Sequence, residues 1–546
     1  MCRFKNKKMW KSGINKLLFS YLILTFLSSC FSKKINSVSN SNSVNNEIIY
    51  HVFQRSFYDS NGDETGDLKG LQEKLDYLQD LGVTSIQLLP LYHSVFYHNY
   101  FSDDFYKIDS TLGSMQDYLS LVKEVHRRGM KIYMDMETQY VTEDHPWYKS
   151  SYNNLKSPYS DYLVWTDSAH TKTESIVMNL TELKGYNGVI KKLIMVNLKN
   201  HAVLAYNIKL YSFWLDPDKD GNFEDGVDGF RFDHMMDDLD YKGRVNDLFK
   251  TFWSPLITAI KKVNPKIVNV AEQAEWNSWP TDYITKAGAD RVYSFKLMGG
   301  IRSFNKKYLT LMADSAFHVF PKGPHQVVFI ENHDLPRFAN QVNGYLPKLK
   351  IAAALELLLG QTPSIYYGQE LGMNGKGEWQ KWGMTDANEI PDREAFEWYK
   401  SDTGKGMALW YKNSGPWWDN RYAKPNDGIS LEEEKPDSNS IYNFYKKMIR
   451  IRKSNPVIST GSYETLVNTN DAVFSYQRFD SVNAIIVIVN LSDSAQNTEV
   501  AYPDFGTAKK IIRVLNGTVS PIFFKDKFQI KLSPYAIEVL QLRTKK

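Results

Sequence analysis

Three acidic residues in the middle of the chain each close or closely follow a short run of strand-forming residues. They are Asp233, Glu272 and Asp334. The first run reads VDGFRFD, and because side chains alternate along a strand, Arg231 and Asp233 point the same way. A cation held beside a carboxyl group lowers its pKa and keeps it ionised, which prepares a nucleophile. For this run alone, a structural salt bridge is the alternative interpretation.

Carboxyl groups that meet at one place do not all ionise, because like charges at close range repel. One of the three is then expected to keep its proton, while Arg231 favours the ionised form of Asp233. An ionised nucleophile beside a protonated acid is the pair that retaining glycoside hydrolysis uses, with the carboxyl groups about 5–5.5 Å apart. The chemistry therefore depends on whether the fold brings the three acids together.

Strand-like and helix-like segments alternate from residue 47 to about residue 455. The strand-like runs are residues 48–53, 83–90, 131–135, 227–233, 267–272, 292–297, 326–331 and 364–368. Such alternation predicts a parallel sheet, and this number of strands predicts an α/β fold of the (β/α)8 TIM barrel type. The carboxyl ends of barrel strands share one mouth, where we expect the three acids to converge.

Two further segments complete the predicted organisation. Residues 136–200 are polar, aromatic and weakly periodic, which is typical of a functional loop or of a small subdomain inserted after the third strand. Residues 456–546 contain runs of alternating apolar and polar residues, which predict a separate antiparallel β domain. The catalytic barrel is therefore expected over residues 47–455.

Four segments together resemble the alpha-amylase family of glycoside hydrolases, in particular bacterial members that act on oligosaccharides and starch. They read GVDGFRFD (226–233), VAE (270–272), FIENHDLPR (329–337) and TPSIYYGQELGM (362–373). The resemblance extends from about residue 48 to the C-terminus and implies that the last domain is a β-sandwich. It also implies that Asp233 is the nucleophile, Glu272 the general acid and base, and Asp334 the carboxylate that binds sugar hydroxyls.

The resemblance also implies a set of residues that bind the substrate. Arg231 and His333 would contact the sugar at the cleavage site, and Tyr100 would stack beneath it; Tyr140 and Arg337 are further candidates. The chain departs from the family pattern at three places, which are Gln139-Tyr140, Phe101 and Met236-Asp237. These changes fall toward the 4- and 6-hydroxyls and the acceptor side, so we expect the reaction type to persist and the substrate to differ.

Three functions are compatible with this pattern. The first is a retaining hydrolase of alpha-glucosidic bonds in starch-like glucans or malto-oligosaccharides. The second is a transglycosylase or a sucrose- or maltose-isomerising enzyme, in which a sugar hydroxyl intercepts the same intermediate. The third is a non-catalytic glycan-binding protein, which the intact Asp233, Glu272 and Asp334 disfavour.

Two acidic loops are candidates for structural calcium sites, and we expect at least one site to hold calcium. The first offers oxygen ligands at alternate positions, as a calcium loop does, with a backbone carbonyl at Thr65 by resemblance to related oligosaccharidases. Its residues are Asp59, Asn61, Asp63, Thr65 and Asp67. The second loop, residues 216–226, begins similarly but has Val227 where a calcium loop has its twelfth-position glutamate. A plain turn and a calcium site are equally compatible with this second loop.

The N-terminus predicts a lipoprotein of the bacterial cell envelope. A basic stretch and the apolar run 17–27 precede Leu-Ser-Ser-Cys, which resembles a lipobox. This predicts a signal peptide over residues 1–30 and a flexible linker over residues 31–46. It also predicts a lipid anchor through Cys30 that holds the protein on a membrane, with the outer membrane favoured. The net charge of +4 is too small to indicate a nucleic acid partner, so the expected partner is an alpha-glucan or oligosaccharide.

Overall fold

A computed structural model describes residues 46–321, 323, 325–418, 427–502, 508–515 and 520–544. The predicted signal peptide, Cys30 and the predicted linker up to residue 45 lie outside the described residues. Within the described part, no helix has both the length and the apolar composition needed to cross a bilayer.

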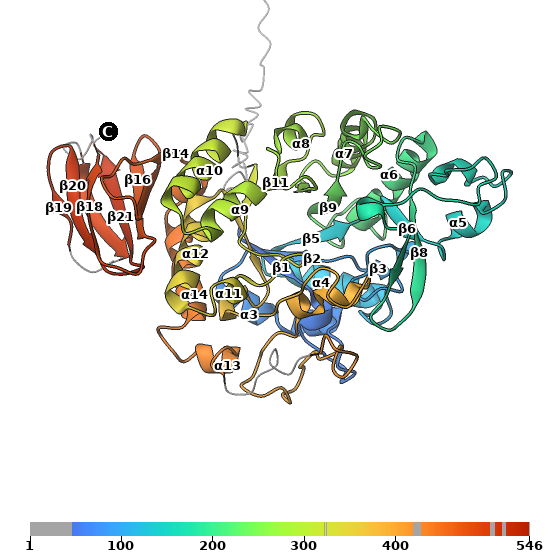
Figure 1. Ribbon diagram of the computed structural model, residues 1–546, viewed down its shortest axis with the longest axis horizontal. Helices are drawn as coiled ribbons and strands as arrows, with labels where there is room; N and C mark the ends of the chain where they lie inside the picture. Colours follow the sequence, from blue (N-terminus) through green and yellow to red (C-terminus); the bar gives the residue numbers. More distant parts are fainter. Residues whose placement is uncertain are drawn as a thin grey trace, which may run out of the picture. The chain divides into compact units, whose positions relative to one another are not determined.

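A closed barrel of eight parallel strands forms the centre of the structure, in the order β1-β13-β12-β11-β10-β9-β5-β2 (Figure 1). Its strands are β1 (Ile49–Val52), β2 (Ser85–Leu88), β5 (Lys131–Met136), β9 (Gly229–Met235), β10 (Val270–Gln273), β11 (Arg291–Tyr293), β12 (Gln326–Val328) and β13 (Thr362–Tyr366). Each predicted run contributes one strand, so the predicted TIM barrel is confirmed. Several predicted runs extend beyond the observed strands. In one of them Phe295, expected in a strand, begins helix α9 (Phe295–Arg302).

Helices connect the strands and cover the barrel. They include α2 (Leu68–Glu73), α3 (Leu75–Leu81), α4 (Met115–Arg127), α6 (His201–Leu215), α7 (Ser254–Val263), α10 (Lys306–Val319), α12 (Leu346–Leu359) and α14 (Ile441–Ser454). Local signals fix their ends: Ser114 and Asp117 form a capping box at the start of α4, and Gly82 ends α3 in the left-handed conformation (φ +100°).

The segment between β5 and α6 carries a small antiparallel sheet of its own. Its elements are β6 (Tyr140–Thr142), α5 (Pro146–Ser151), β7 (Glu182–Lys184) and β8 (Ile190–Met195), with the sheet order β6-β8-β7. The chain therefore leaves the barrel after its third strand, as the sequence predicts. The limits of residues 136–200 as a subdomain stay a prediction.

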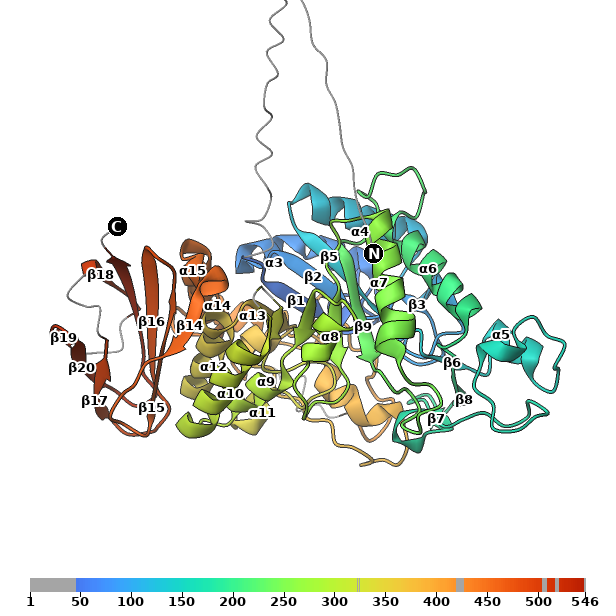
Figure 2. The same ribbon diagram turned by 90° about the horizontal axis from the view of Figure 1, so that it is seen from above.

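The C-terminal strands form two antiparallel sheets (Figure 2). One sheet contains β14 (Ser462–Thr465), β15 (Val473–Phe479), β16 (Asn483–Asn490), β21 (Ile537–Thr544) and β18 (Ala508–Leu515); the other contains β17 (Gln496–Ala501), β20 (Lys527–Leu532) and β19 (Ile522–Phe523). Buried side chains from both sheets, such as Ile486, Val500 and Phe528, share one core. The predicted C-terminal β-sandwich is therefore confirmed, whereas the boundary at residue 456 stays a prediction.

Candidate active site

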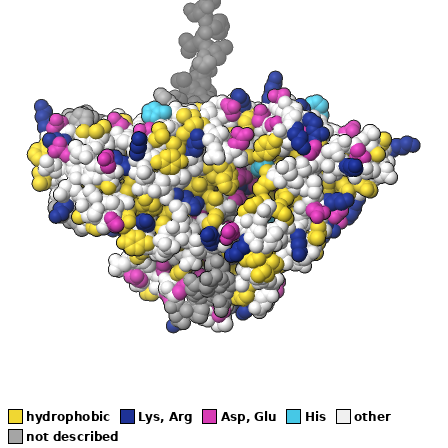
Figure 3. Space-filling model, viewed as in Figure 1, with side chains coloured by type: hydrophobic (Ala, Val, Ile, Leu, Met, Phe, Trp, Pro, Cys, Tyr) yellow, Lys and Arg dark blue, Asp and Glu magenta, His cyan; other side chains and the backbone are white. Residues whose placement is uncertain are grey.

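Three adjacent barrel strands bring acidic residues to the same end of the barrel. Asp135 lies near the end of β5, Asp233 near the end of β9, and Glu272 near the end of β10. Arg231 is paired in register with Asp135 on one side and with Val270 on the other. Figure 3 shows acidic side chains within a hollow near the middle of the viewed face, bordered by hydrophobic side chains.

One buried guanidinium holds this group together. Arg231 is 2% exposed, and its Nη1 donates to Asp135 Oδ2 (2.7 Å) and to Asp233 Oδ1. Its Nη2 lies 3.0 Å from Glu272 Oε2. A single fixed cation therefore serves three carboxyl groups, which leaves the site with an excess of negative charge when all of them are ionised.

The acidity of the site differs from the expectation based on Arg231 alone. Burial raises the pKa of Asp233 to about 7; Arg231 lowers it, but Asp135 and Asp334 oppose that effect. The prediction of a lowered pKa is therefore wrong for the carboxyl group as a whole. Burial likewise raises the pKa of Glu272 to about 8; Arg231 lowers it, but Asp233 and Asp334 oppose that effect. Both groups therefore keep their protons to a higher pH than ordinary carboxyl groups do.

Asp334 reaches the site through a chain of polar contacts after β12. His333 Nε2 lies 3.2 Å from Asp334 Oδ1 and 2.9 Å from the Tyr100 hydroxyl, which also donates to Asp135 (2.9 Å). The rings of Tyr100 and His333 are nearly parallel, at 14° and 5.8 Å between centroids. Burial and the nearby Arg231 hold the pKa of His333 well below its usual range, so this ring is neutral.

The residues around His234 fix the backbone just after Asp233. His234 adopts φ +41°, a conformation that is costly for a bulky residue and is often retained at functional sites. Its backbone N–H donates to Glu272 Oε2 (2.8 Å), and its Nδ1 lies 3.0 Å from the Tyr140 hydroxyl. Gln139 donates to the carbonyl oxygens of Asp233 and His234 (3.2 Å for the latter). The unusual Gln139-Tyr140 pair therefore supports the strand that carries the predicted nucleophile.

Arg337 is the one predicted sugar-binding residue that the fold does not bring into this group. Its side chain is fully buried, pairs with Glu331 (3.0 Å) and donates to the Tyr367 carbonyl oxygen (2.6 Å). The guanidinium also lies over the Tyr366 ring, 4.2 Å from its centroid. Arg337 therefore holds the loop after β12 in place, which corrects its interpretation as a sugar ligand.

Arg393 belongs to the site although the sequence pattern did not indicate it. It ends the short helix η6 (Asp386–Arg393), where its Nη2 contacts Asp334 (3.4 Å) and Glu389 (2.7 Å). Its Nε donates to the His333 carbonyl oxygen (3.0 Å). The only signal in the sequence is the spacing of Glu389 and Arg393 by four residues, which is common on ordinary surfaces.

The two acidic loops differ in how their carboxylates are arranged. In the first loop, Asp59 Oδ1 accepts from the backbone N–H groups of Asn61 (2.9 Å) and Gly62 (2.7 Å), and Asp67 caps α2 through Gly70. Its donor set of side-chain and backbone oxygens suits calcium. Among the described residues, however, the one group of three potential ligand side chains whose atoms all lie within 4.8 Å is Asp216, Asp218 and Asp225.

Comparison with known proteins agrees with the fold and the motifs. The family model "Alpha amylase, catalytic domain" matches residues 51–461. Alpha-amylase 3 of Dictyoglomus thermophilum is 30% identical over 542 residues, covering 96% of this chain and 98% of the relative. The trehalose synthase/amylase TreS of Mycobacterium tuberculosis is 27% identical over 524 residues, covering 83% of this chain and 82% of that relative.

A solved structure gives the same result in three dimensions. The crystal structure of alpha-amylase from H. orenii superposes with a TM-score of 0.74 at 27% identity, covering 91% of this chain and 99% of the other. The sequence-based prediction of a retaining glycosidase that cleaves alpha-glucosidic bonds is thus confirmed. The chain belongs to the alpha-amylase family of glycoside hydrolases.

Proposed function

We propose that this enzyme hydrolyses alpha-glucosidic bonds in malto-oligosaccharides or starch-like glucans, with Asp233 as nucleophile and Glu272 as acid and base. The observation that carries the assignment is the contact of one guanidinium, Arg231, with both carboxyl groups. This arrangement keeps the two groups close together, as a retaining mechanism requires. Burial raises the pKa of Glu272, which keeps a proton available on the proposed acid.

The reaction then proceeds in two displacements. Asp233 attacks the anomeric carbon while Glu272 gives its proton to the leaving glycosidic oxygen, so a glycosyl-enzyme ester forms and the first sugar leaves. Glu272, now ionised, takes a proton from a water molecule whose oxygen attacks the same carbon. The ester bond breaks, Asp233 regains its negative charge, and Glu272 is protonated again. Asp334 and His333 would hold the sugar hydroxyls during both steps.

The surroundings of Asp334 support short substrates over polymers. Arg393 is 2% exposed and bridges Asp334 to the Tyr97 hydroxyl, which accepts from Nη1 at 2.8 Å. Tyr97 in turn stacks on Trp410 at 4.7 Å between centroids. These side chains form a wall beside Asp334, so a glucan chain would have to end close to the cleavage site on that side.

A substrate panel with linkage-resolved products tests this function. Maltotriose, isomaltose, sucrose, trehalose and pullulan would be incubated with the full chain, and proton NMR would follow the first anomer released. We expect alpha-anomeric glucose or maltose from malto-oligosaccharides, and little release from pullulan. Transfer or isomerised products in place of free sugar would favour the transglycosylase alternative. Binding of the sugars without any product would favour the non-catalytic alternative.

We also propose that the first acidic loop holds a structural calcium ion through Asp59, Asn61, Asp63, the Thr65 carbonyl and Asp67. The buried positions of Asp59 and Asp67 and the alternate spacing of oxygen donors support this proposal. The ion would stiffen the loop that leads into α2 and would take no part in the chemistry. Calcium should raise the melting temperature of the chelator-treated protein, and Asp63→Asn should reduce that rise. An unchanged rise in Asp63→Asn would count against this site.

The membrane anchor at Cys30 is a further proposal, carried by the sequence pattern alone. We expect the protein in the membrane fraction of a bacterial envelope and its Cys30→Ser variant in the aqueous fraction. Labelling with a radioactive fatty acid would check acylation directly. Equal partition of the two forms would argue against the anchor.

A further inference from the structure

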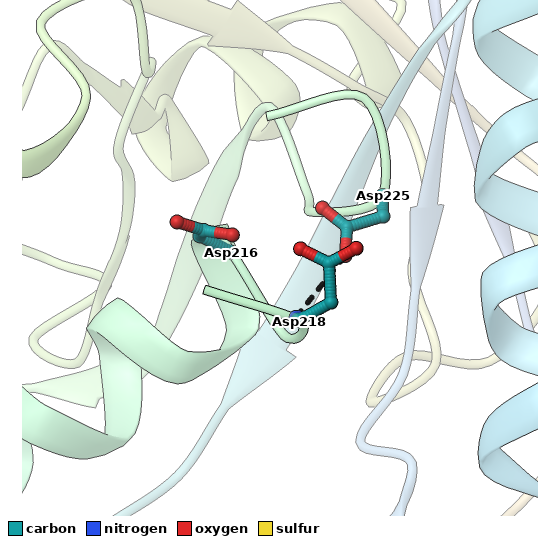
Figure 4. Close-up of side chains that lie close together, drawn as sticks. All are labelled: Asp216, Asp218 and Asp225. Atoms are coloured by element: carbon teal, nitrogen blue, oxygen red, sulfur yellow. Dashed lines mark hydrogen bonds between the residues drawn. The ribbon is translucent and has the colours of Figure 1, made fainter. Parts of the chain in front are cut away.

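The loop between α6 and β9 gathers three carboxylates at the end of the barrel opposite to the catalytic residues. Asp216 follows the last residue of α6, Asp218 lies two residues later, and Asp225 returns from the far arm of the loop. One oxygen atom from each lies within 4.8 Å of the others. Figure 4 shows the three side chains around a common space, with a hydrogen bond linking Asp218 and Asp225.

Two of these carboxylates have an oxygen atom that the protein leaves without a partner. Asp225 is 4% exposed, and its Oδ1 is buried and accepts no hydrogen bond. Asp216 Oδ1 is also buried without a partner. Their second oxygens accept from backbone N–H groups, of Asp218 (3.2 Å) and of Gly221 (3.1 Å) respectively. A buried carboxylate oxygen without a donor or a cation is costly, so these atoms point to a missing positive partner.

No cationic side chain fills that role in the described part of the chain. His126 lies against the same loop, but it pairs with Asp228 (3.0 Å). None of Asp216, Asp218 and Asp225 forms an ion pair with Lys, Arg or His among the described residues. We propose that these three aspartates hold a calcium ion in the loop that leads into β9.

The loop chemistry favours calcium over other divalent ions. All the candidate ligand atoms are oxygens, which disfavours zinc because zinc prefers nitrogen and sulfur ligands. The loop begins with aspartates at alternate positions, which are Asp216, Asp218 and Asp220, and Gly221 makes a turn at φ +79°. Calcium accepts six to eight oxygen ligands in adaptable geometry, whereas magnesium requires a nearly ideal octahedron that a loop of this kind does not enforce.

Asp225 takes the place of the glutamate that the sequence lacks. The twelfth position is Val227, which is 1% exposed and cannot ligate. The chain instead turns inward at Gly226, where a Cβ atom would lie 1.9 Å from the Leu215 carbonyl oxygen. Because Gly226 passes so close to the end of α6, its neighbour Asp225 faces Asp216 and Asp218. The site is therefore compatible with the fold only when residue 226 is glycine.

A cation at this place would connect two elements of the catalytic barrel. Val227 N–H donates to the Trp214 carbonyl oxygen of α6 (3.0 Å), and Asp228 N–H donates to the Ile132 carbonyl oxygen of β5 (2.8 Å). The ion would add a third link, between the end of α6 and the start of β9. Its role is structural, since β9 carries Arg231 and Asp233 at its other end.

The test compares calcium binding by variants in a background in which the first calcium loop is weakened. The full chain with Asp63→Asn, freed of metal by a chelator, would be titrated with calcium by isothermal calorimetry and by thermal melting. Asp218 is exposed, so a variant that also carries Asp218→Asn should fold normally. This second substitution is expected to raise the calcium dissociation constant by about tenfold or more. Adding Asp225→Asn should further reduce the calcium-dependent rise in melting temperature relative to the Asp63→Asn background.

Glu224→Gln is the matched control, because it removes one negative charge from an exposed position of the same loop outside the cluster. It should leave the calcium affinity unchanged. The proposal is overturned when Asp218→Asn binds calcium as tightly as Glu224→Gln does, or when the Asp63→Asn background binds no calcium. A melting temperature that magnesium raises as much as calcium, at equal concentration, would overturn the assignment of calcium.

Discussion

The two ends of strand β9 each gather carboxylates, yet they stabilise them differently. At the end of the strand, Asp233 meets Asp135 and Glu272 around the fixed guanidinium of Arg231. At its start, Asp225 meets Asp216 and Asp218 with no cationic side chain among the described residues. Each cluster contains buried polar atoms without a partner, among them Asp135 Oδ1 in the first and Asp225 Oδ1 in the second. The difference is that every carboxyl group of the first cluster also contacts a guanidinium.

This difference shows how the environment decides what an aspartate does. A permanent cation that serves too many carboxyl groups leaves one of them protonated, which is what acid catalysis needs. A cluster without a cation gains most from an external ion and loses that gain when the ion is removed. Four changes along this strand and its neighbours test the contrast.

The largest effect is expected from Asp233→Asn. The amide cannot form the glycosyl ester, so kcat on malto-oligosaccharides should fall by about 10⁴-fold or more. Asp228→Asn, just before the same strand, is the matched control. Among the described residues, the side chain of Asp228 hydrogen-bonds to His126 and to the Ile132 backbone, so this variant should retain kcat. A variant Asp233→Asn with wild-type turnover would refute the assignment of the nucleophile.

A smaller loss is expected from Glu272→Gln. Removing the general acid should lower kcat on malto-oligosaccharides by about 10²–10⁴-fold. Formation of the glycosyl ester from alpha-glucosyl fluoride should be far less affected, because fluoride leaves without a proton. A pre-steady-state burst of fluoride release would measure this step. Exposed Glu275→Gln is the control, and equal losses on both substrates would contradict the acid role.

The pH profile should report the shared guanidinium. Activity requires ionised Asp233 and protonated Glu272, so kcat/KM should rise as the pH passes about 7 and fall as it passes about 8. Asp135 raises the pKa of Asp233, so Asp135→Asn should move the acidic limb to lower pH. Initial rates at low substrate concentration measure both limbs. An acidic limb that stays in place would show that Asp135 does not influence Asp233.

The smallest effect concerns the start of β9. Burial lowers the pKa of His126, but its hydrogen bonds to Asp228 and to the Glu224 backbone, together with the charges of both residues, raise the pKa overall. The resulting stabilisation is fully present below the unfolded-state pKa and is lost as the pH rises through the folded-state value. His126 should therefore contribute more to the free energy of unfolding at about pH 5.5 than at about pH 8. Urea unfolding at both pH values measures this contribution, which His126→Gln should remove. A His126→Gln variant with the wild-type difference would contradict this role.

Much of the fold was predictable from local patterns. Each barrel strand lies in a short apolar run of the sequence that is bounded by glycine, proline or polar residues. Each of the eight runs formed a strand. The positions of Asp233, Glu272 and Asp334 follow from that pattern, because the carboxyl ends of parallel strands meet at one mouth. Strand ends were less predictable, as Phe295 shows, since the last residues of a run can begin the next helix.

Long-range contacts decided what the sequence pattern could not. Arg337 and Arg393 are both basic residues near family motifs, but only the folded loops place Arg393 on Asp334 and Arg337 behind it, on Glu331. The pKa of Asp233 depends on burial and on residues of other strands, so its nearest cation in the sequence gave the wrong direction.

The sequence by itself determined the barrel, the family and the three acidic residues, because these depend on local periodicity and on contiguous motifs. Tertiary structure alone decided that Asp225 joins Asp216 and Asp218 and that one guanidinium serves three carboxyl groups. The physical reason is that charge interactions and desolvation depend on distances through space, which the order of residues along the chain does not specify.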